Sequence, residues 1–205
     1  MASAAMIEQP AGFGRAPFIV GLGGTLRPNS STEKALHVVL RAAASLGAET
    51  LLLDGAALDL PLYAPDRPDR TPAAARLVEA LRRADGIVLG SPGYHGGISG
   101  LVKNALDYVE DMRGDPNPYF EGRAVGVIAT AAGWQATMTT MNALRDVVHA
   151  LRGWPTPLGV PINTMEPVFD ATGECLAPRL TEQLAAVASQ VVGFAHQRAA
   201  LSRAG

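Results

Sequence analysis

Cysteine is nearly absent from this chain, because Cys175 is the only one among 205 residues. A disulfide within the chain needs two cysteines and a cysteine-based zinc site needs several, so the sequence excludes both. Histidine is also sparse, with four residues. His37, His149 and His196 fall on separate predicted helices without the spacing of metal ligands, and we therefore predict no metal site.

Long apolar runs and a large net charge are also missing. No run is long enough to span a bilayer and the N-terminus lacks a basic-then-apolar signal pattern, so we expect a cytoplasmic protein without a membrane segment. A formal net charge of -2 argues against a nucleic-acid partner. Hydrophobic residues make up 48% of the sequence. This is enough for one core, and we expect a single domain over residues 16–205 behind a flexible leader of residues 1–15.

Short apolar runs alternate with helical patterns along the rest of the chain. Strands are predicted over residues 17–23, 50–53, 86–89, 124–130 and 158–162. Helices are predicted over residues 33–46, 101–112, 137–151 and 178–198. A further helix is predicted to begin at Thr71 and Pro72, as its N-cap and first helical position. This alternation predicts an α/β fold, a doubly wound five-stranded parallel sheet in three layers. We take its strand order to be 2-1-3-4-5, one of the two common orders of such sheets, in which the order reverses between the first and third strands. Ligands bind such sheets beyond the carboxyl ends of the strands, where the strand order reverses.

The turn between the first strand and the first helix has the composition of a phosphate-binding loop. The unpaired N–H groups and the dipole at a helix N-terminus attract an anion, and glycines let the backbone approach it. Arg27 adds a fixed positive charge. The candidate phosphate-binding residues are Thr25, Arg27, Ser30, Ser31 and Thr32. Ser30 and Glu33 also fit a capping box, which any helix can have.

Three known phosphate-binding motifs can be compared with this loop. A Walker loop needs a Gly-Lys-Ser/Thr sequence, which is missing. A dinucleotide fingerprint fits Gly21 and Gly23 but meets Leu26 where a third small residue belongs, although Asp54 after the next strand keeps a dinucleotide-binding dehydrogenase open. A flavodoxin-type loop, which holds the single phosphate of FMN with hydroxyl groups, fits best.

Two further loops are predicted to reach the same end of the sheet. Residues 90–97 are rich in glycine, and their backbone N–H groups can reach the polar edge of a flavin ring. Tyr94 is expected either to stack on the ring or to pack beneath the loop. Residues 131–135 can add backbone contacts, while Trp134 fits a subunit contact equally well. The candidate residues of these two loops are Ser91, Pro92, Gly93, Tyr94, His95, Gly96, Ala132, Gly133 and Trp134.

Together these loops resemble the NAD(P)H-dependent FMN reductase family, of flavodoxin-like fold. The first family motif, Gly-Ser-x-Arg-x-x-Ser, is matched by residues 24–30 with Thr25 in place of serine. The second motif is matched by Pro92, Tyr94, Gly100, Lys103 and Asn104. The resemblance covers about residues 17–165. At two positions the sequence differs from the family: Gly93 stands where relatives often have Glu, and His95 where they often have Asn. This loss of a polar side chain beside the ring leaves the preferred electron acceptor open.

The resemblance implies FMN with its phosphate on the first loop and its ring on the other two, hydride transfer from NAD(P)H, and a homodimer or homotetramer. One expected function is an FMN reductase that supplies reduced flavin to a monooxygenase. A second is an enzyme that retains FMN and reduces a quinone, an azo dye or a metal oxyanion. A third is a flavodoxin-type electron carrier, which the near-neutral charge disfavours. Because the flavin carries the chemistry, we assign no catalytic acid or base, His95 included.

Overall fold

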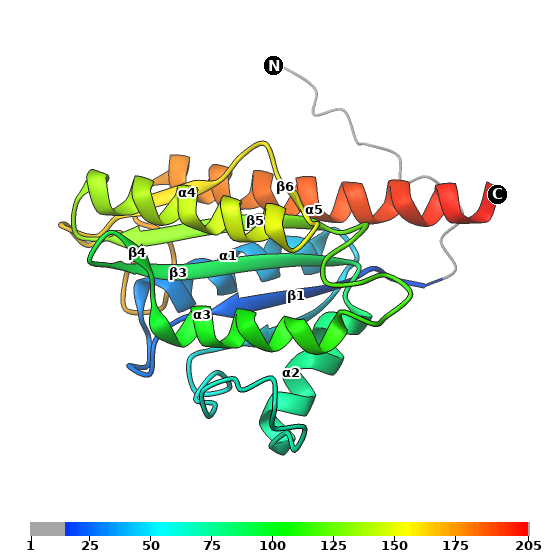
Figure 1. The fold of residues 1–205 in the computed structure, drawn as a ribbon. Helices are drawn as coiled ribbons and strands as arrows, with labels where there is room; N and C mark the ends of the chain where they lie inside the picture. The colour runs from blue at the N-terminus through cyan, green and yellow to red at the C-terminus, as the bar shows by residue number, and fades with distance from the viewer. Residues whose placement is uncertain (1–14, 205) are drawn as a thin grey trace.

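The computed structural model describes residues 15–204, and these form a parallel sheet between two layers of helices (Figure 1). The predicted leader therefore lies outside the described residues, except for Arg15. The strands are β1 (Phe18–Gly23), β2 (Glu49–Leu53), β3 (Gly86–Tyr94), β4 (Gly97–Ile98), β5 (Ala124–Ala131), β6 (Trp154–Pro155) and β7 (Val160–Asn163). The helices are α1 (Ser31–Ser45), α2 (Pro72–Arg83), α3 (Gly100–Asp107), the 3-10 helix η1 (Tyr108–Met112), α4 (Trp134–Ala150) and α5 (Pro178–Ala204).

The strand order is β2-β1-β3-β5-β6, with β7 also paired to β5 and every pair along this path parallel. This is the predicted order 2-1-3-4-5, with β6 and β7 sharing the fifth place. The strand predicted over residues 158–162 is present as β7, which begins two residues later, whereas the two-residue strand β6 before it was not predicted. The chain leaves the sheet between β6 and β7, where Pro157 has no N–H to pair and the Thr156 hydroxyl donates to the Leu158 carbonyl at 2.8 Å.

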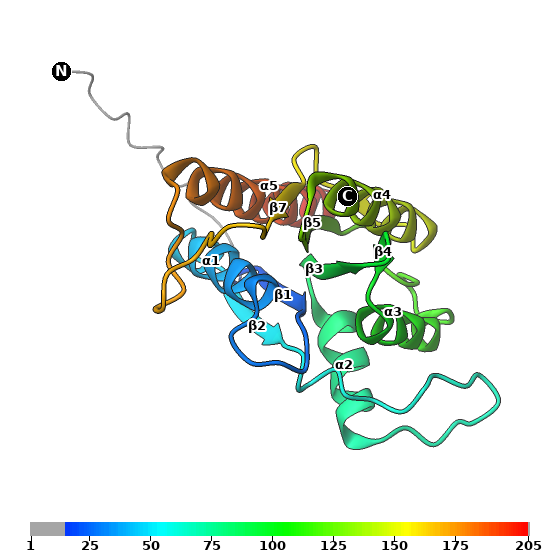
Figure 2. The same ribbon diagram turned by 90° about the vertical axis from the view of Figure 1, so that its left-hand side faces the viewer.

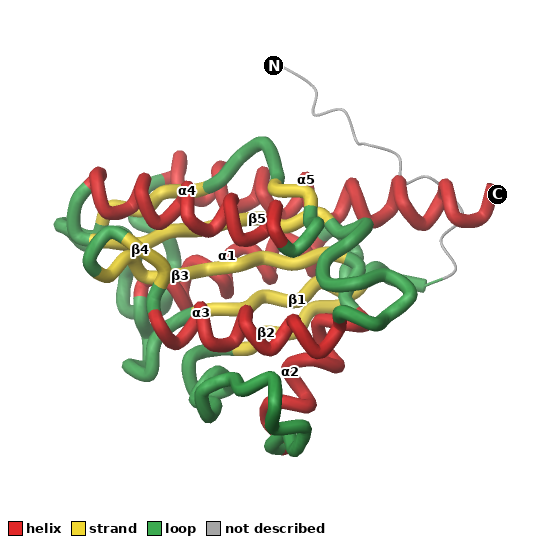
Figure 3. The backbone as a smooth tube through the Cα atoms, viewed as in Figure 1, coloured by secondary structure: helices red, strands yellow, loops and turns green. Residues whose placement is uncertain are grey.

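Each face of the sheet is covered by its own set of helices, as the turned view shows (Figure 2). Helices α1 and α5 pack with Ile19 and Val88 on one face, and α2, α3 and α4 pack with Val20 and Leu89 on the other. Successive side chains of a strand point to opposite faces, so a strand covered on both sides must be apolar throughout. This explains the unbroken apolar runs, and Figure 3 shows the strands as the middle layer.

The second glycine-rich segment differs from its prediction as a loop. Strand β3 continues through it to Tyr94, because Gly90, Ser91 and Pro92 pair in register with β5. The chain then turns back at His95 and Gly96, whose φ angles of 52° and 82° are those of a tight hairpin turn, and β4 pairs antiparallel with β3. The segment is therefore a rigid hairpin.

The helices begin where side chains can cap them. Ser30 caps α1 and Thr71 caps α2, both as predicted. Helix α4 begins at Trp134, three residues before the predicted start at Thr137, so only Ala132 and Gly133 separate it from β5. No helix within residues 15–204 combines the length and the apolar character needed to cross a membrane.

Candidate functional site

A crevice of about 290 Å³ lies at the carboxyl end of the sheet, where the three predicted loops meet. It opens between the start of α1, the β3–β4 hairpin and the end of β5. The predicted residues that line it are Thr25, Arg27, Ser30, Ser31, Thr32, Pro92, Gly93, Tyr94 and Ala132. Residues that were not predicted complete its walls: Thr130, Ala131 and Thr164.

A second and larger hollow of about 570 Å³ adjoins this crevice on the side of α3. Thr25, Arg27, Pro92 and Tyr94 line both, so the two spaces form one continuous depression. We call the first space the loop crevice and the second the α3 hollow. The side chain of Tyr94, 56% exposed, stands at their boundary.

Hydrogen-bond donors gather where α1 begins. The Ser30 hydroxyl oxygen accepts the Glu33 amide at 3.2 Å, which leaves the hydroxyl hydrogen to donate. Ser31 and Thr32 occupy the first two helical positions, and N–H groups at these positions have no carbonyl acceptor within the helix. The predicted capping box and the predicted anion site are therefore compatible. The cap uses the Glu33 amide and leaves the amides of Ser31 and Thr32 for an anion.

Arg27 is the only charged residue that lines either space. Its side chain is exposed and makes no ion pair or hydrogen bond within residues 15–204. The loop that carries it is held by the Thr25 hydroxyl, which donates to the Arg27 carbonyl at 2.9 Å, and turns at Asn29 with φ of 58°. A single unpaired cation beside free amides makes this end of the crevice attractive to an anion.

Two threonines join the walls of the crevice. The hydroxyls of Thr32 on α1 and Thr130 at the end of β5 lie 2.6 Å apart and are buried. This hydrogen bond ties α1 to β5 at the crevice wall, and the Thr32 amide remains for a ligand. Thr130 could not be recognised from the sequence, because it reads as one more residue of an apolar strand.

Glycine is required where β1 and β3 end side by side. Gly23 has φ of 149°, and a Cβ atom there would lie 1.9 Å from the Gly90 carbonyl oxygen. A Cβ atom on Gly90 would lie 3.0 Å from Leu36 and Thr32 of α1. These glycines bring the first loop, β3 and α1 close enough together to form the floor of the crevice.

Five predicted residues do not line the loop crevice or the α3 hollow: Ser91, His95, Gly96, Gly133 and Trp134. Ser91 is fully buried, and its hydroxyl donates to the Pro92 carbonyl at 2.8 Å and accepts the Ser99 amide at 3.0 Å. His95 and Gly96 form the exposed tip of the hairpin. The Gly133 amide donates to Asn163 Oδ1 at 2.9 Å, and Trp134 lines a different cavity.

Some residues that sequence reasoning missed had a detectable signal and others had none. Ser99 caps α3 by accepting the Val102 amide, so Ser99, Gly100 and Leu101 could have been found as a second helix start. Thr164 follows β7 in a segment that matched no motif. Its place in the crevice depends on the pairing of β7 with β5, which the local sequence does not encode.

No carboxylate and no histidine lines either space, so the site offers no evident proton donor or acceptor of those kinds. Within residues 15–204 no group of three His, Cys, Asp or Glu side chains is placed to hold a metal ion. Cys175 lies outside the crevice and the α3 hollow, and burial raises the pKa of its thiol.

The donor set fits FMN. Its phosphate dianion needs several N–H and O–H donors without an opposing carboxylate, and the start of α1 with Arg27 provides them. Its flat ring needs a rigid wall, which the β3–β4 hairpin provides. The depression is of a size usual for ligands of this kind.

The relatives of this chain include proteins named as FMN reductases and as azoreductases. The NAD(P)H-dependent FMN reductase PA1204 of Pseudomonas aeruginosa is 27% identical over 168 residues, covering 80% of this chain and 87% of that protein. The NADPH-dependent FMN reductase ArsH of Shigella flexneri is 30% identical over 193 residues, covering 92% and 74%. An NADPH azoreductase of Bacillus sp. is 33% identical over 128 residues, covering 62% and 68%.

Solved structures share the fold at low sequence identity. The NAD(P)H:(acceptor) oxidoreductase FerB of Paracoccus denitrificans superposes with a TM-score of 0.72 at 23% identity, covering 89% of this chain and 99% of that one. A flavodoxin of Streptococcus pneumoniae superposes with a TM-score of 0.59 at 11% identity, covering 86% and 98%. The fold is therefore flavodoxin-like, as predicted. Residues 17–165 match the model of the NADPH-dependent FMN reductase family, and the chain belongs to this family of NAD(P)H-dependent oxidoreductases.

Proposed function

We propose that this chain binds FMN in the loop crevice and catalyses the transfer of hydride from NAD(P)H to FMN. The observation that carries the proposal is the convergence of free amides, hydroxyls and the unpaired Arg27 at the start of α1, beside a rigid hairpin wall. Family membership supports the same activity.

The residues of the crevice position the cofactor. The amides of Ser31 and Thr32, the Ser30 hydroxyl and Arg27 hold the phosphate. Tyr94 and the hairpin hold the ring, and the adjoining α3 hollow leaves room beside it for the nicotinamide. When bound, FMN supplies a ring that accepts hydride and passes electrons to an acceptor. The protein's contribution is to place two rings in contact.

The absorption spectrum of the purified protein tests this proposal. We expect the protein to bind FMN, and anaerobic NADPH or NADH to bleach the flavin absorbance near 450 nm within seconds, on the order of the turnover of ordinary enzymes. Bound NAD without flavin would indicate the dinucleotide-binding dehydrogenase instead. Flavin that binds but is reduced by neither nicotinamide would indicate the electron carrier.

A second candidate is an enzyme that keeps FMN and reduces a quinone, azo dye or metal oxyanion. The similarity to a Bacillus azoreductase favours it. Retention of FMN through gel filtration, with quinone-dependent NAD(P)H oxidation that needs no added FMN, would support this candidate. NAD(P)H oxidation that requires added FMN would support a reductase that releases reduced flavin. In the predicted case a monooxygenase receives that flavin. The homo-oligomeric state stays a prediction that the same gel filtration tests.

A further inference from the structure

The segment between β5 and α4 forms part of the wall of the loop crevice and has little in its own sequence to hold it in place. Only Ala132 and Gly133 separate the strand from the helix. Gly133 has φ of 112°, a conformation that favours glycine. Among the residues that the structure describes, none caps α4 with its side chain and none lies within 4 Å of the position of a Cβ atom on Gly133. The conformation of this segment must therefore be fixed from elsewhere in the chain.

Asn163, at the end of β7, makes the contact that fixes it. Its Oδ1 atom accepts the Gly133 amide at 2.9 Å and the Met165 amide at 3.0 Å. Both partners are N–H donors, so the oxygen of the side-chain amide is the atom that must face them. One side chain thus joins the segment after β5 to the segment after β7.

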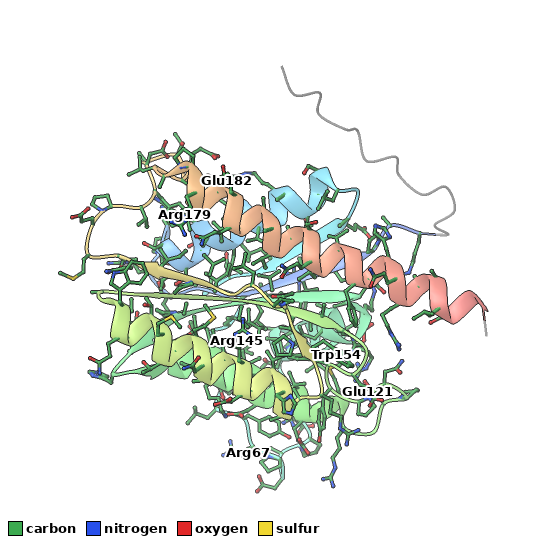
Figure 4. All side chains as sticks on the ribbon, turned by 90° about the horizontal axis from the view of Figure 1, so that it is seen from above. Arg67, Glu121, Arg145, Trp154, Arg179 and Glu182 are labelled. Atoms are coloured by element: carbon green, nitrogen blue, oxygen red, sulfur yellow. The ribbon has the colours of Figure 1, made fainter. Side chains whose placement is uncertain are left out.

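The pairing of β5 with β7 brings these two segments together. Ala131 is in register with Asn163, and its carbonyl accepts the Thr164 amide at 2.8 Å. Seen from above, the segment that holds β7 runs between α4 and α5, with Arg179 at the start of α5 (Figure 4). We call the joined segments, residues 131–133 and 163–165, the clamped wall.

The clamped wall borders the part of the crevice that we assign to the flavin ring. Ala132 and Thr164 line the crevice, whereas Asn163 stands behind them and does not line it. Ala131 lies against the β3–β4 hairpin, since a Cβ atom on Gly93 would be 3.2 Å from the Ala131 Cβ atom. The hairpin is the proposed support of the ring, so a shift of the clamped wall would change the space that the ring occupies.

We propose that Asn163 is a positioning residue for the flavin ring. It acts through the clamped wall, which it holds in the binding conformation before the cofactor arrives. Without this side chain, part of the binding free energy would be spent on ordering the wall, and the affinity for the ring would fall. The inference rests on the proposed function, because it takes FMN as the ligand of the crevice.

Fluorescence titration of FMN and of riboflavin tests this role with Asn163→Leu. Asn163 also lines a cavity beside α5 whose walls include Ile162 and Leu180, and a leucine side chain suits these apolar surroundings. We expect the variant to bind both flavins about five- to tenfold more weakly, the scale of one hydrogen bond, because both contain the ring. Gln190→Leu is the matched control. Gln190 Oε1 accepts the Leu158 amide at 3.2 Å outside the crevice, so both affinities should stay unchanged.

A rescue variant separates the hydrogen bonds from the packing of the side chain. Asn163→Asp retains an oxygen that can accept both amides, so its flavin affinities should lie within about twofold of the parent's. The visible absorption band of bound FMN gives a second measurement, because it reports the surroundings of the ring. This band should move toward that of free FMN in Asn163→Leu and stay unchanged in Gln190→Leu.

Amide hydrogen exchange tests the same contact in the parent protein, where folding is not in question. We expect the Gly133 amide to be protected before FMN is added, because Asn163 accepts it without any ligand. Fast exchange of this amide in the absence of FMN would overturn the proposal.

The binding results separate this role from the proposed function. Unchanged flavin affinities in Asn163→Leu, an equal loss in Gln190→Leu, or a loss for FMN without one for riboflavin would each overturn the role of Asn163. A parent protein that binds neither flavin would contradict the proposed function and this role together. Bound flavin that NAD(P)H does not reduce would contradict hydride transfer alone, and the affinities would still decide the role of Asn163.

Discussion

At the scale of single residues, the loop crevice depends on groups that the rest of the protein leaves unused. The Ser91 hydroxyl is used by its neighbours, both as donor and as acceptor, and the Thr32 and Thr130 hydroxyls share one hydrogen bond in the crevice wall. Arg27 and the first amides of α1 are free. Residue types alone suggested five equivalent donors, and the hydrogen bonds divide them into ligand-facing and structural groups.

Arg27→Ala is expected to weaken FMN binding by about 1.5–3 kcal/mol, the scale of a hydrogen bond to a charged group. Because Arg27 is exposed, the loss should shrink as salt is raised. Fluorescence titration of FMN at two salt concentrations measures the effect, with Arg76→Ala as the control. Unchanged affinity in the Arg27 variant would remove this residue from the phosphate site.

Gly23→Ala is expected to destabilise the protein by about 3 kcal/mol or more, because the new Cβ atom lies 1.9 Å from the Gly90 carbonyl oxygen at a φ that disfavours side chains. Gly114→Ala is the matched control, since nothing lies within 4 Å of its Cβ position. Urea unfolding compares the two. Similar midpoints for both variants would contradict the close contact between β1 and β3.

At the scale of elements, α1 is held in place from several sides. It is linked at two points to the segment before α5, because Lys34 Nζ donates to the Asp170 carbonyl at 2.9 Å and Arg41 pairs with Glu174 at 2.7 Å. Thr32 ties its first turn to β5. A phosphate-binding helix must not shift as the ligand binds, and these links fix α1 before binding.

Ser30→Ala and Thr71→Ala separate capping from ligand binding. Each removes an N-cap hydroxyl that accepts an amide at 3.2 Å, so each should cost about 1 kcal/mol of stability in urea unfolding. Only Ser30 lines the crevice, so only its variant should also lose FMN affinity. An equal loss of affinity in the Thr71 variant would mean that helix stability, and not the hydroxyl, controls binding.

The long connection between β2 and α2 is anchored to α3 by one amide side chain. Asn104 accepts the Tyr63 amide at 2.9 Å and donates to the Pro61 carbonyl at 3.0 Å. Arg70 holds the same connection by a bidentate pair with Asp111 at 2.7 Å. The asparagine that the family motif contains thus has a structural partner outside the cofactor site.

Asn104→Ala should remove the partner of the part-buried Tyr63 amide and one of the two donors to the Pro61 carbonyl, at a cost of about 1 kcal/mol. We expect faster hydrogen exchange across residues 60–70 and cleavage there by a protease at low concentration. Lys103→Ala, which removes only an exposed pair with Asp107, is the control. Protection factors that do not change in the Asn104 variant would contradict this anchoring role.

At the scale of the whole molecule, the site exists because three strands end at one edge of the sheet. The loops after β1, β3 and β5 are far apart in the sequence, and the order β2-β1-β3-β5 brings them together. A ligand that contacts all three links segments which otherwise meet only through the core. Its binding should therefore stabilise the fold as a unit.

FMN at about 100 times its Kd should add about 2.7 kcal/mol of stability, which for a chain of this length raises Tm by about 5–10 °C. Riboflavin, which has the same ring without the phosphate, should raise Tm less, because the start of α1 is then left without its anion. Differential scanning fluorimetry measures both. Equal shifts for the two ligands would place the phosphate outside the crevice.

The sequence by itself determined the features that depend on neighbours along the chain. Apolar runs and helical periodicity predicted the α/β class, and Ser30 with Glu33 marked the start of α1. Only the tertiary structure decided that residues 90–94 continue β3, that Thr32 pairs with Thr130, and that Thr164 lies in the crevice. The physical reason is distance along the chain. Propensity and capping act over a few residues, whereas strand pairing and shared hydroxyl groups join segments about 100 residues apart, as Thr32 and Thr130 are.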